Sequence, residues 1–214
     1  MIRETSTPPQ RRRRSDGEQS HAAILEEAAR LATVEGIDGL SLARLADAVG
    51  MSKSGLFAHF KSKEELQLAT VEAASAVFAQ QVTQPASQAA TALARVRSLV
   101  ERYLAYLEVE TFPGGCFFAS TLAEMDMQPG PVRDRLVAFL GEWLGQIETA
   151  VRDAQAEGAI DAEEEPAQLT FEIEAALLLA NAQFIVMRTP EPIHRARRAI
   201  NRRLASALAR PVDG

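Results

Sequence analysis

The stretch GMSKSGLFAHFKSKEEL, residues 50–66, decides the fold of the N-terminal region. Gly50 can take the left-handed backbone conformation of a tight turn, and Ser52, which follows it closely, is a typical helix N-cap. The residues Ser62-Lys63-Glu64-Glu65 have the form of a capping box, S-x-x-E, which opens a further helix. The stretch is therefore predicted to contain a turn, a short helix and the start of a longer helix that ends at about residue 81.

The residues before this stretch predict two more helices. One is expected to begin near Asp16 and to end at Gly36 and Gly39, and a short one follows, capped by Ser41, over about residues 42–49. A short helix, a glycine turn and a second short helix, with another helix beside them, form a helix-turn-helix pattern. Such a motif places the N-terminal end of its second helix in the major groove of DNA.

The second short helix carries the side chains that this geometry requires. Ser52, Lys53 and Ser54 supply hydroxyl groups and an ammonium group for base edges, and Gly55 allows close approach. Leu56 and Phe60 are expected to anchor the helix in the core.

Phosphate contacts are expected at the edges of the motif. Ser41 and the helix start behind it can present backbone N–H groups to a phosphate oxygen. Lys63 lies in the first helical turn, where a cation opposes the helix dipole, and this small cost is consistent with a phosphate contact. His59 either binds a phosphate or packs as a neutral ring on the domain, and both readings stay open.

The rest of the 214-residue chain is also predicted to be helical. Alanine and leucine are abundant, and no alternating run of β-branched residues indicates a strand. Turn residues such as Pro129-Gly130-Pro131 separate the segments. We expect an all-α protein of about nine helices. The later ones run over about residues 87–110, 116–125, 131–158, 163–188 and 192–209.

Bulk composition restricts the class of protein. The net charge is −6, but the first 66 residues hold equal numbers of acidic and basic residues, so the acidity belongs to the remainder. A single cysteine excludes an intrachain disulfide, and neither a secretory signal nor a run of about 18 apolar residues is recognisable. We expect a cytoplasmic protein with no membrane contact. Residues 1–15, with four arginines from Arg11 to Arg14, are expected to be a disordered basic arm that either solubilises the chain or follows DNA.

The run GIDGLSLARLADAVGMSKSGLFAHFKSKEEL, residues 36–66, resembles the DNA-binding domain of the TetR (tetracycline repressor) family of bacterial regulators. The resemblance extends over about residues 20–70. It implies that residues 16–66 form the DNA-binding domain and that residues 82–214 form a helical ligand-binding and dimerisation domain. It also implies base contacts from residues 52–55 and backbone contacts from Ser41, Arg44 and Lys63. A departure is Phe57, because the family commonly has an aromatic hydroxyl there for a phosphate, and a bare ring reaches a thymine methyl or a sugar instead.

The resemblance further implies a homodimer on a palindromic operator, released by a small-molecule effector. The interface is expected over about residues 167–188 and 192–209, although the apolar segment 175–187 could equally be an internal core helix. Candidate effector contacts are aromatic residues, each of which could instead be plain core, together with two amides inside an apolar helix. They are Tyr103, Tyr106, Phe112, Phe117, Phe118, Phe139, Trp143, Phe171, Asn181 and Gln183, with Cys116 added because of its place at a helix start.

Cys116 suggests an alternative function. At a helix N-terminus the thiol pKa falls, and a reactive thiolate could sense electrophiles or oxidants. The other reading is a small buried residue. An enzyme is not expected, because nucleophile-elbow, P-loop and zinc-protease motifs are absent and the three histidines are too dispersed in sequence for a metal site. No cofactor or metal is expected, and the sequence leaves repressor and activator undecided.

Overall fold

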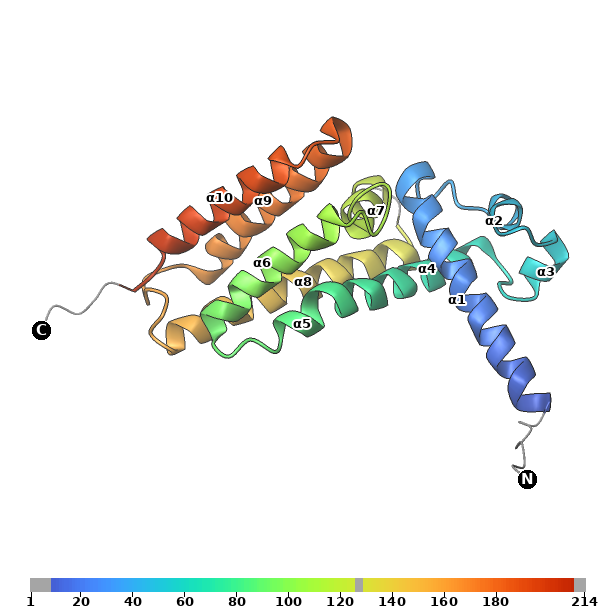
Figure 1. Cartoon of the computed structure of the whole chain (residues 1–214), viewed down its shortest axis with the longest axis horizontal. Coiled ribbons are helices and arrows are strands. Elements are labelled where there is room, and N and C mark those ends of the chain that lie inside the picture. Colours follow the sequence, from blue (N-terminus) through green and yellow to red (C-terminus); the bar gives the residue numbers. More distant parts are fainter. Residues whose placement is uncertain (1–8, 126–128, 210–214) are drawn as a thin grey trace, which may run out of the picture.

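The computed structural model describes residues 9–125 and 129–209, without the side chains of residues 9–19. Figure 1 shows their arrangement. The helices are α1 (Pro9–Glu35), α2 (Leu42–Val49), α3 (Lys53–Phe57), α4 (Lys63–Phe78), the π-helical segment η1 (Ala79–Thr83), α5 (Gln84–Ala86), α6 (Ala92–Glu108), α7 (Phe117–Met125), α8 (Pro131–Ala156), α9 (Pro166–Met187) and α10 (Glu191–Ser206). In the described residues the only β-type pairing is one isolated bridge between Ile160 and Leu208. The predicted all-α class is confirmed.

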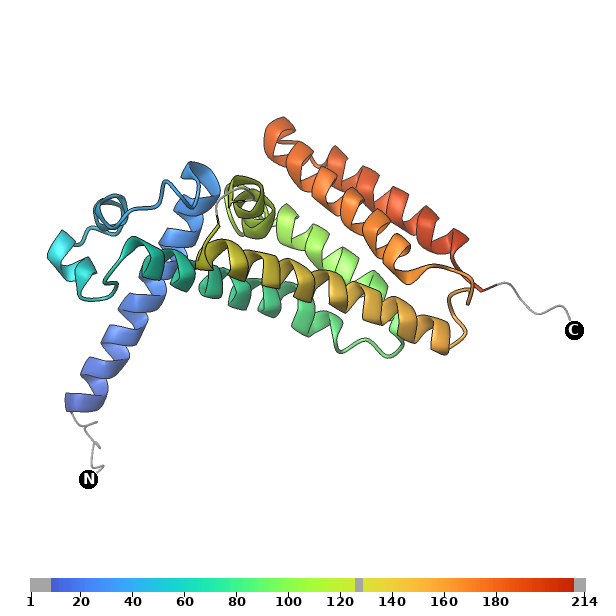
Figure 2. The same ribbon diagram turned by 180° about the vertical axis from the view of Figure 1, so that it is seen from behind.

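The first helix begins earlier than predicted. It starts at Pro9 rather than near Asp16, so the expected disordered arm is wrong for residues 9–15, and residues 1–8 lie outside the described part. Proline suits the first helical position because its fixed φ is already helical, and arginine is a good helix former. The N-terminal part of α1 projects away from the rest of the molecule in both Figure 1 and Figure 2.

Local capping sets the starts of α2, α3 and α4. The hydroxyl groups of Ser41, Ser52 and Ser62 each accept a backbone N–H from three residues later, at 3.0–3.2 Å. At α4 the returning bond of the capping box is shifted, because the Glu65 carboxylate accepts from the backbone N–H of Lys61, at 2.7 Å. These short-range bonds satisfy N–H groups that have no partner inside the helix.

The segment between α4 and α6 differs from the prediction. Helical backbone continues past residue 81 through the π-helical segment and α5, so it includes Pro85, and α6 begins at Ala92 rather than at 87. Pro85 lies near the start of α5, where a missing N–H costs little. The start of α6 is fixed by Thr91, whose hydroxyl accepts the Ala94 N–H at 3.2 Å.

Two hydrophobic clusters divide the chain. The smaller one joins α1, α2, α3 and the start of α4, and it includes Leu45, Leu56, Phe60 and Leu66. The larger one joins α4 to α10 and also receives the C-terminal end of α1. Helix α4 belongs to both, because Leu66 lies in the smaller cluster and Phe78 in the larger. Helix α4 therefore connects the helix-turn-helix region to the interior of the larger body, by which we mean the helices packed around the larger cluster.

Helices α9 and α10 pack side by side at one edge of the larger body (Figures 1 and 2). By length and composition α9 could cross a membrane, but a core helix of a soluble protein passes the same test. One face of α9, with Ile173 and Leu177, is buried in the core, whereas Phe171 and Val186 are 68% and 83% exposed. An outward apolar face on a helix that is already packed on its inner side is the usual mark of a protein–protein contact.

Candidate nucleic-acid interface and ligand cavity

The helix-turn-helix has the predicted local geometry. Gly50 ends α2 with φ +67°, and its N–H donates to the Ala46 carbonyl. Leu56 and Phe60 are fully buried and fix α3 on the smaller core, as the sequence predicted. Figure 1 places α2 and α3 at the end of the molecule opposite to the C-terminal end of α10.

The side chains predicted for base contacts lie on the outside of α3. Ser52, Lys53 and Ser54 are exposed, and the ring of Phe57 is 53% exposed. An exposed phenylalanine ring on a short helix has no packing function on the solvent side, so it is available for an apolar contact with DNA.

Local packing gives a second reason for a glycine at position 55, besides the predicted close approach to DNA. A Cβ placed there would lie 3.2 Å from the Ser52 hydroxyl, which caps α3 and also lies 3.2 Å from the Ser54 hydroxyl. The absence of a side chain at Gly55 therefore protects the N-cap of α3.

Both cations predicted for phosphates are held in ion pairs. The Arg44 guanidinium binds the Glu35 carboxylate through two nitrogens, at 2.5–3.0 Å, and this bond lowers the pKa of Glu35. The Lys63 ammonium donates to the Asp38 carboxylate at 2.7 Å. All four side chains are substantially exposed, and exposed pairs are weak, so a phosphate can replace either carboxylate.

His59 lies on the inner edge of this region. Its ring is 5.8 Å from the ring of His21, and both rings lie within 6.3 Å of Phe60. The dispersal of histidines in the sequence therefore does not hold for this pair in space. Among the described residues, however, no group of three or more His, Cys, Asp or Glu side chains could hold a metal ion.

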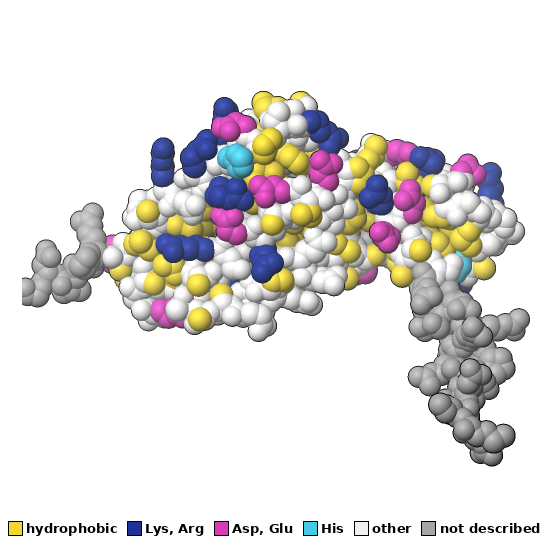
Figure 3. All heavy atoms as spheres, in the orientation of Figure 1, with side chains coloured by type: hydrophobic (Ala, Val, Ile, Leu, Met, Phe, Trp, Pro, Cys, Tyr) yellow, Lys and Arg dark blue, Asp and Glu magenta, His cyan; other side chains and the backbone are white. Residues whose placement is uncertain are grey.

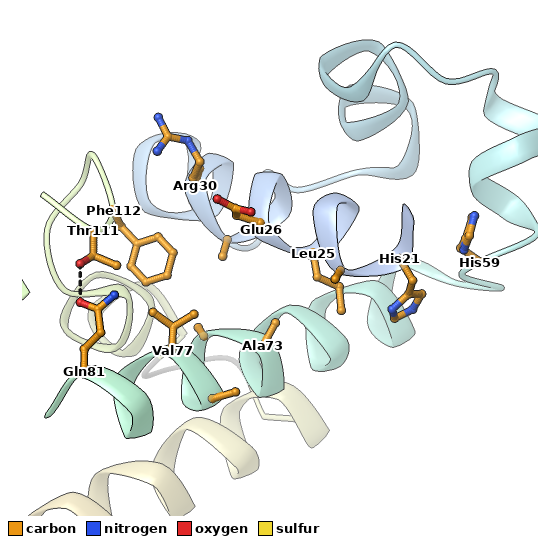
Figure 4. A pocket seen from close by; sticks show the side chains of 14 residues that line it. His21, Leu25, Glu26, Arg30, His59, Ala73, Val77, Gln81, Thr111 and Phe112 are labelled. Atoms are coloured by element: carbon orange, nitrogen blue, oxygen red, sulfur yellow. Dashed lines mark hydrogen bonds between the residues drawn. The ribbon is translucent and has the colours of Figure 1, made fainter. Parts of the chain in front are cut away.

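The two histidines stand at one end of a groove of about 1050 Å³ between α1 and α4 (Figure 4). Phe112 lies at its other end, close to a hydrogen bond from the Thr111 hydroxyl to Gln81, 2.8 Å. Phe112, predicted to contact the effector, therefore lines this groove between the two clusters.

A second cavity, of about 700 Å³, lies inside the larger body. Helices α4, α6, α7, α8 and α9 all contribute to its wall. Six of the eleven predicted effector contacts line it: Tyr103, Cys116, Phe118, Phe139, Trp143 and Phe171. Side chains that the sequence reasoning missed also line it, notably Phe78, Thr170 and Glu174.

Aromatic rings form much of this wall. Trp143 stacks on Tyr103 with ring centroids 5.9 Å apart, and Phe78 meets the Trp143 ring edge-on at 5.2 Å. The Trp143 indole N–H donates to the Glu174 carboxylate at 2.8 Å. Burial raises the pKa of Glu174 above its ordinary value, and the indole bond opposes this in part.

The remaining predicted contacts lie elsewhere. Tyr106 and Phe117 are buried in the core beside the cavity and do not line it. The Asn181 side-chain oxygen accepts the Cys116 backbone N–H at 2.8 Å, which satisfies this amide inside the protein. Gln183 is partly buried on α9, outside the cavity lining.

Cys116 does not have the lowered pKa that its helix start suggested. The residue is buried, and burial raises the pKa of its thiol more strongly than the nearby backbone N–H groups lower it. Burial also raises the pKa of the neighbouring Tyr103 hydroxyl well above its usual value. The thiol is therefore held in its neutral form.

Helix α7 connects this cavity to the helix-turn-helix. Its residues Phe118 and Leu122 line the cavity, and its Glu124 carboxylate accepts the backbone N–H groups of Ile37 and Asp38, each at 2.7 Å. These two N–H groups lie in the turn between α1 and α2. A second link is Gln67 on α4, whose amide donates to the Ile37 carbonyl at 2.8 Å.

Family comparisons agree with this arrangement. Residues 24–70 match the family described as bacterial regulatory proteins, tetR family, and residues 92–200 match the family described as tetracyclin repressor-like, C-terminal domain. The chain belongs to the TetR family. TetR-family proteins are DNA-binding transcriptional regulators, and the resemblance seen in residues 36–66 is confirmed.

Relatives of this TetR-family chain match it over nearly its whole length. The transcriptional regulator AcuR of Cereibacter sphaeroides is 26% identical, covering 92% of this chain and 95% of AcuR. A TetR transcriptional regulator from Chloroflexus aurantiacus J-10-FL has a TM-score of 0.84 at 24% identity, covering 91% and 98% of the two chains. AibR, in a complex with isovaleryl coenzyme A and operator DNA, has a TM-score of 0.68 at 23% identity, covering 84% and 95%.

Proposed function

We propose that this TetR-family regulator is a ligand-responsive repressor, which binds a palindromic operator as a homodimer and is released when a small molecule enters the 700 Å³ cavity. The observation that carries the proposal is the link through α7, which lines the cavity and also holds the turn before α2 through Glu124. A ligand that moves α7 changes the support of the helix-turn-helix. Differential affinity for the two arrangements is then sufficient for release.

The same observation supports a division of the chain into two functional parts. We assign DNA binding to residues 16–66, with α4 as the connecting helix, and ligand binding and dimerisation to residues 82–214. Residues 52–55 and Phe57 are assigned to the major groove, and Ser41, Arg44, His59 and Lys63 to the edges of the contact. The AibR complex supports this assignment, because a relative of the same fold holds operator DNA and a ligand together.

Dimerisation is assigned to α9 and α10. The exposed apolar side chains of α9 supply a surface that water does not favour. They include Phe171, Leu178, Leu179, Val186 and Met187. Lys and Arg side chains gather over α10 beside it (Figure 3), and Arg197 and Arg203 on that helix are paired with carboxylates within the chain. Two copies joined through these helices can present two recognition helices to half-sites about 34–36 Å apart.

The proposal is tested with DNA from the promoter of the protein's own gene. We expect a footprint with two-fold symmetry, formed by a dimer, and loss of that footprint with a small molecule that raises the melting temperature of the protein. A footprint without symmetry would contradict the proposed operator geometry. Release by a molecule that still binds after the cavity has been filled, for example in Leu122→Trp, would contradict the proposed ligand site. The cytoplasm is the compartment in which this function takes place.

The alternative function, oxidant or electrophile sensing through Cys116, has less support. The thiol is buried and its pKa is raised, so its reactive thiolate form is disfavoured. The ligand-binding proposal predicts that peroxide treatment changes operator binding neither in the wild type nor in Cys116→Ser. Release by peroxide in the wild type that disappears in Cys116→Ser would instead establish the thiol sensor.

A further inference from the structure

The charged side chains in the cavity wall are acidic. Glu148 and Glu174 are among its lining residues, and no lysine, arginine or histidine in the described part of the chain lines it. The Glu148 carboxylate is already paired with Arg152, one turn further along α8. In the described part of the chain Glu174 has no such ionic partner, and its carboxylate accepts a neutral hydrogen bond from Trp143. A carboxylate at this site lacks the cation that normally accompanies a desolvated charge.

The hydroxyl of Thr170 is a second polar group in the cavity wall that lacks a partner among the described residues. Thr170 lies one turn before Glu174 on α9, and both residues line the cavity. The threonine is only 4% exposed, and its hydroxyl oxygen has no hydrogen-bond partner in the described structure. Buried hydroxyl groups nearly always have a partner, so an unpaired one in a cavity wall points to a missing ligand group.

The aromatic part of the wall favours positive charge. The rings of Trp143, Tyr103 and Phe78 lie together beside the Glu174 carboxylate. The face of an aromatic ring attracts a cation, most strongly for tryptophan and in a site from which water is excluded. An anionic ligand would meet two carboxylates and ring faces of the same sign.

We propose that the effector is an apolar organic cation, such as a protonated amine that carries a hydrocarbon or aromatic body. Its ammonium group is placed between the Glu174 carboxylate and the Thr170 hydroxyl, over the ring of Trp143. The apolar body occupies the part of the cavity lined by Phe118 and Phe139. This inference rests on the proposed function, because it names the ligand class of the same cavity.

Three probes of one shape test the ligand class: 4-phenylbutylamine, 4-phenylbutan-1-ol and 4-phenylbutanoate. Their binding to the full-length protein is measured by titration calorimetry at neutral pH, and by the fluorescence of Trp143, the only tryptophan of the chain. We expect the amine to bind at least about tenfold more tightly than the alcohol, and the carboxylate to bind more weakly than both. Equal or tighter binding of the alcohol or the carboxylate, or no binding of the amine at its solubility limit, would overturn the inference.

Two variants locate the charge. Glu174→Gln keeps an oxygen acceptor for the Trp143 indole and removes the negative charge, so we expect about a tenfold loss of amine affinity with unchanged alcohol affinity. Glu163→Gln removes the same charge at an exposed position outside the cavity and is expected to change neither affinity. Unchanged amine affinity in Glu174→Gln, with wild-type thermal unfolding, would also overturn the inference.

Operator binding is measured separately on the same preparations. A protein that binds its operator but prefers the carboxylate probe contradicts the cation inference and leaves the proposed repressor function standing. A protein that binds the amine at Glu174 but does not recognise a two-fold symmetric site contradicts the proposed function and leaves the chemistry of the cavity standing.

Discussion

The Glu124 carboxylate accepts the backbone N–H of Ile37 at 2.7 Å, although 87 residues separate the two in the chain. Its other oxygen accepts the N–H of Asp38, so one side chain on α7 holds two consecutive peptide groups of the turn between α1 and α2. Gly36 makes this approach possible, because a Cβ there would lie 2.8 Å from the carboxylate. Helix α7 is at the same time a wall of the ligand cavity.

Removing this carboxylate is expected to weaken both stability and the response to ligand. Glu124→Ala leaves the partly buried N–H of Ile37 without an acceptor, which costs about 1–3 kcal/mol of unfolding free energy, while the exposed N–H of Asp38 returns to water. It also removes a connection between the cavity and the helix-turn-helix, so a ligand is expected to bind with less effect on operator affinity. Urea unfolding and operator titrations with and without ligand measure the two effects.

Glu124→Gln and Glu163→Ala serve as comparisons for this prediction. The glutamine keeps one acceptor of the two, so we expect an intermediate loss, whereas Glu163 is exposed and its removal is expected to change neither stability nor ligand response. A Glu124→Ala protein with unchanged coupling between ligand and operator would show that α4 alone transmits the signal.

The pair between Lys63 and Asp38 predicts an unusual gain of DNA affinity. If Lys63 leaves Asp38 for a phosphate, then Asp38→Asn removes the competitor, and operator binding is expected to tighten by about 0.2–1 kcal/mol, the usual strength of an exposed ion pair. Lys63→Ala is expected to weaken binding to operator and to random DNA alike and to lower the salt dependence by about one counterion. Fluorescence anisotropy across a series of salt concentrations measures both.

Lys53 provides the matched comparison on α3. Because it lies at the N-terminal end of the predicted recognition helix, Lys53→Ala is expected to reduce operator affinity more than random-DNA affinity. The same loss on both DNAs for both lysines would mean that Lys53 contacts the backbone only.

For the preceding prediction, weaker operator binding by Asp38→Asn would show that the ion pair between Lys63 and Asp38 supports the DNA-bound form.

The parts of this structure that the sequence predicts are those with short-range causes. Ser41, Ser52 and Ser62 cap helices through bonds to residues three positions later, so the pattern of residues specifies them directly. The partners of Glu124 are remote in the chain, and nothing in α7 itself indicates them. Thr170 and Glu174 were also missed, although a glutamate within the apolar run FEIEAALLLA is a local signal that a polar partner or a ligand must satisfy it.

The sequence also does not tell which of the aromatic residues line the cavity. Tyr106 and Phe117 have the same composition signal as Tyr103 and Phe118, yet only the latter two line the cavity. The difference is which side of a helix faces the cavity, and that depends on how α6 and α7 pack against α8 and α9. The Cys116 pKa was misjudged for a related reason, because burial depends on the same packing.

Two glycines predict opposite effects of the same substitution. A Cβ at Gly114 would lie 1.9 Å from the Thr33 carbonyl oxygen, so Gly114→Ala forces the loop before α7 away from α1 and is expected to cost about 1–3 kcal/mol. A Cβ at Gly145, inside α8, meets no atom within 4 Å, so Gly145→Ala is expected to stabilise by about 0.5–1 kcal/mol through helix propensity. Thermal and urea unfolding of both variants measure the contrast, and a stabilised Gly114→Ala would contradict the close contact between α1 and the α7 loop.

The raised pKa of Glu174 predicts how stability changes with pH. Burial favours the protonated carboxyl in the folded state, so above the ordinary pKa of 4.5 the folded protein holds this proton more tightly than the unfolded chain does. Wild-type stability relative to Glu174→Gln is therefore expected to fall as pH rises from about 4.5 through the folded-state pKa, and to become constant above it. Chemical unfolding of both proteins at a series of pH values measures this difference, because all other titrating groups are shared. A difference that increases with pH over this window would mean that the charged carboxylate is stabilised in the empty cavity, and that the site has a cationic partner within the protein.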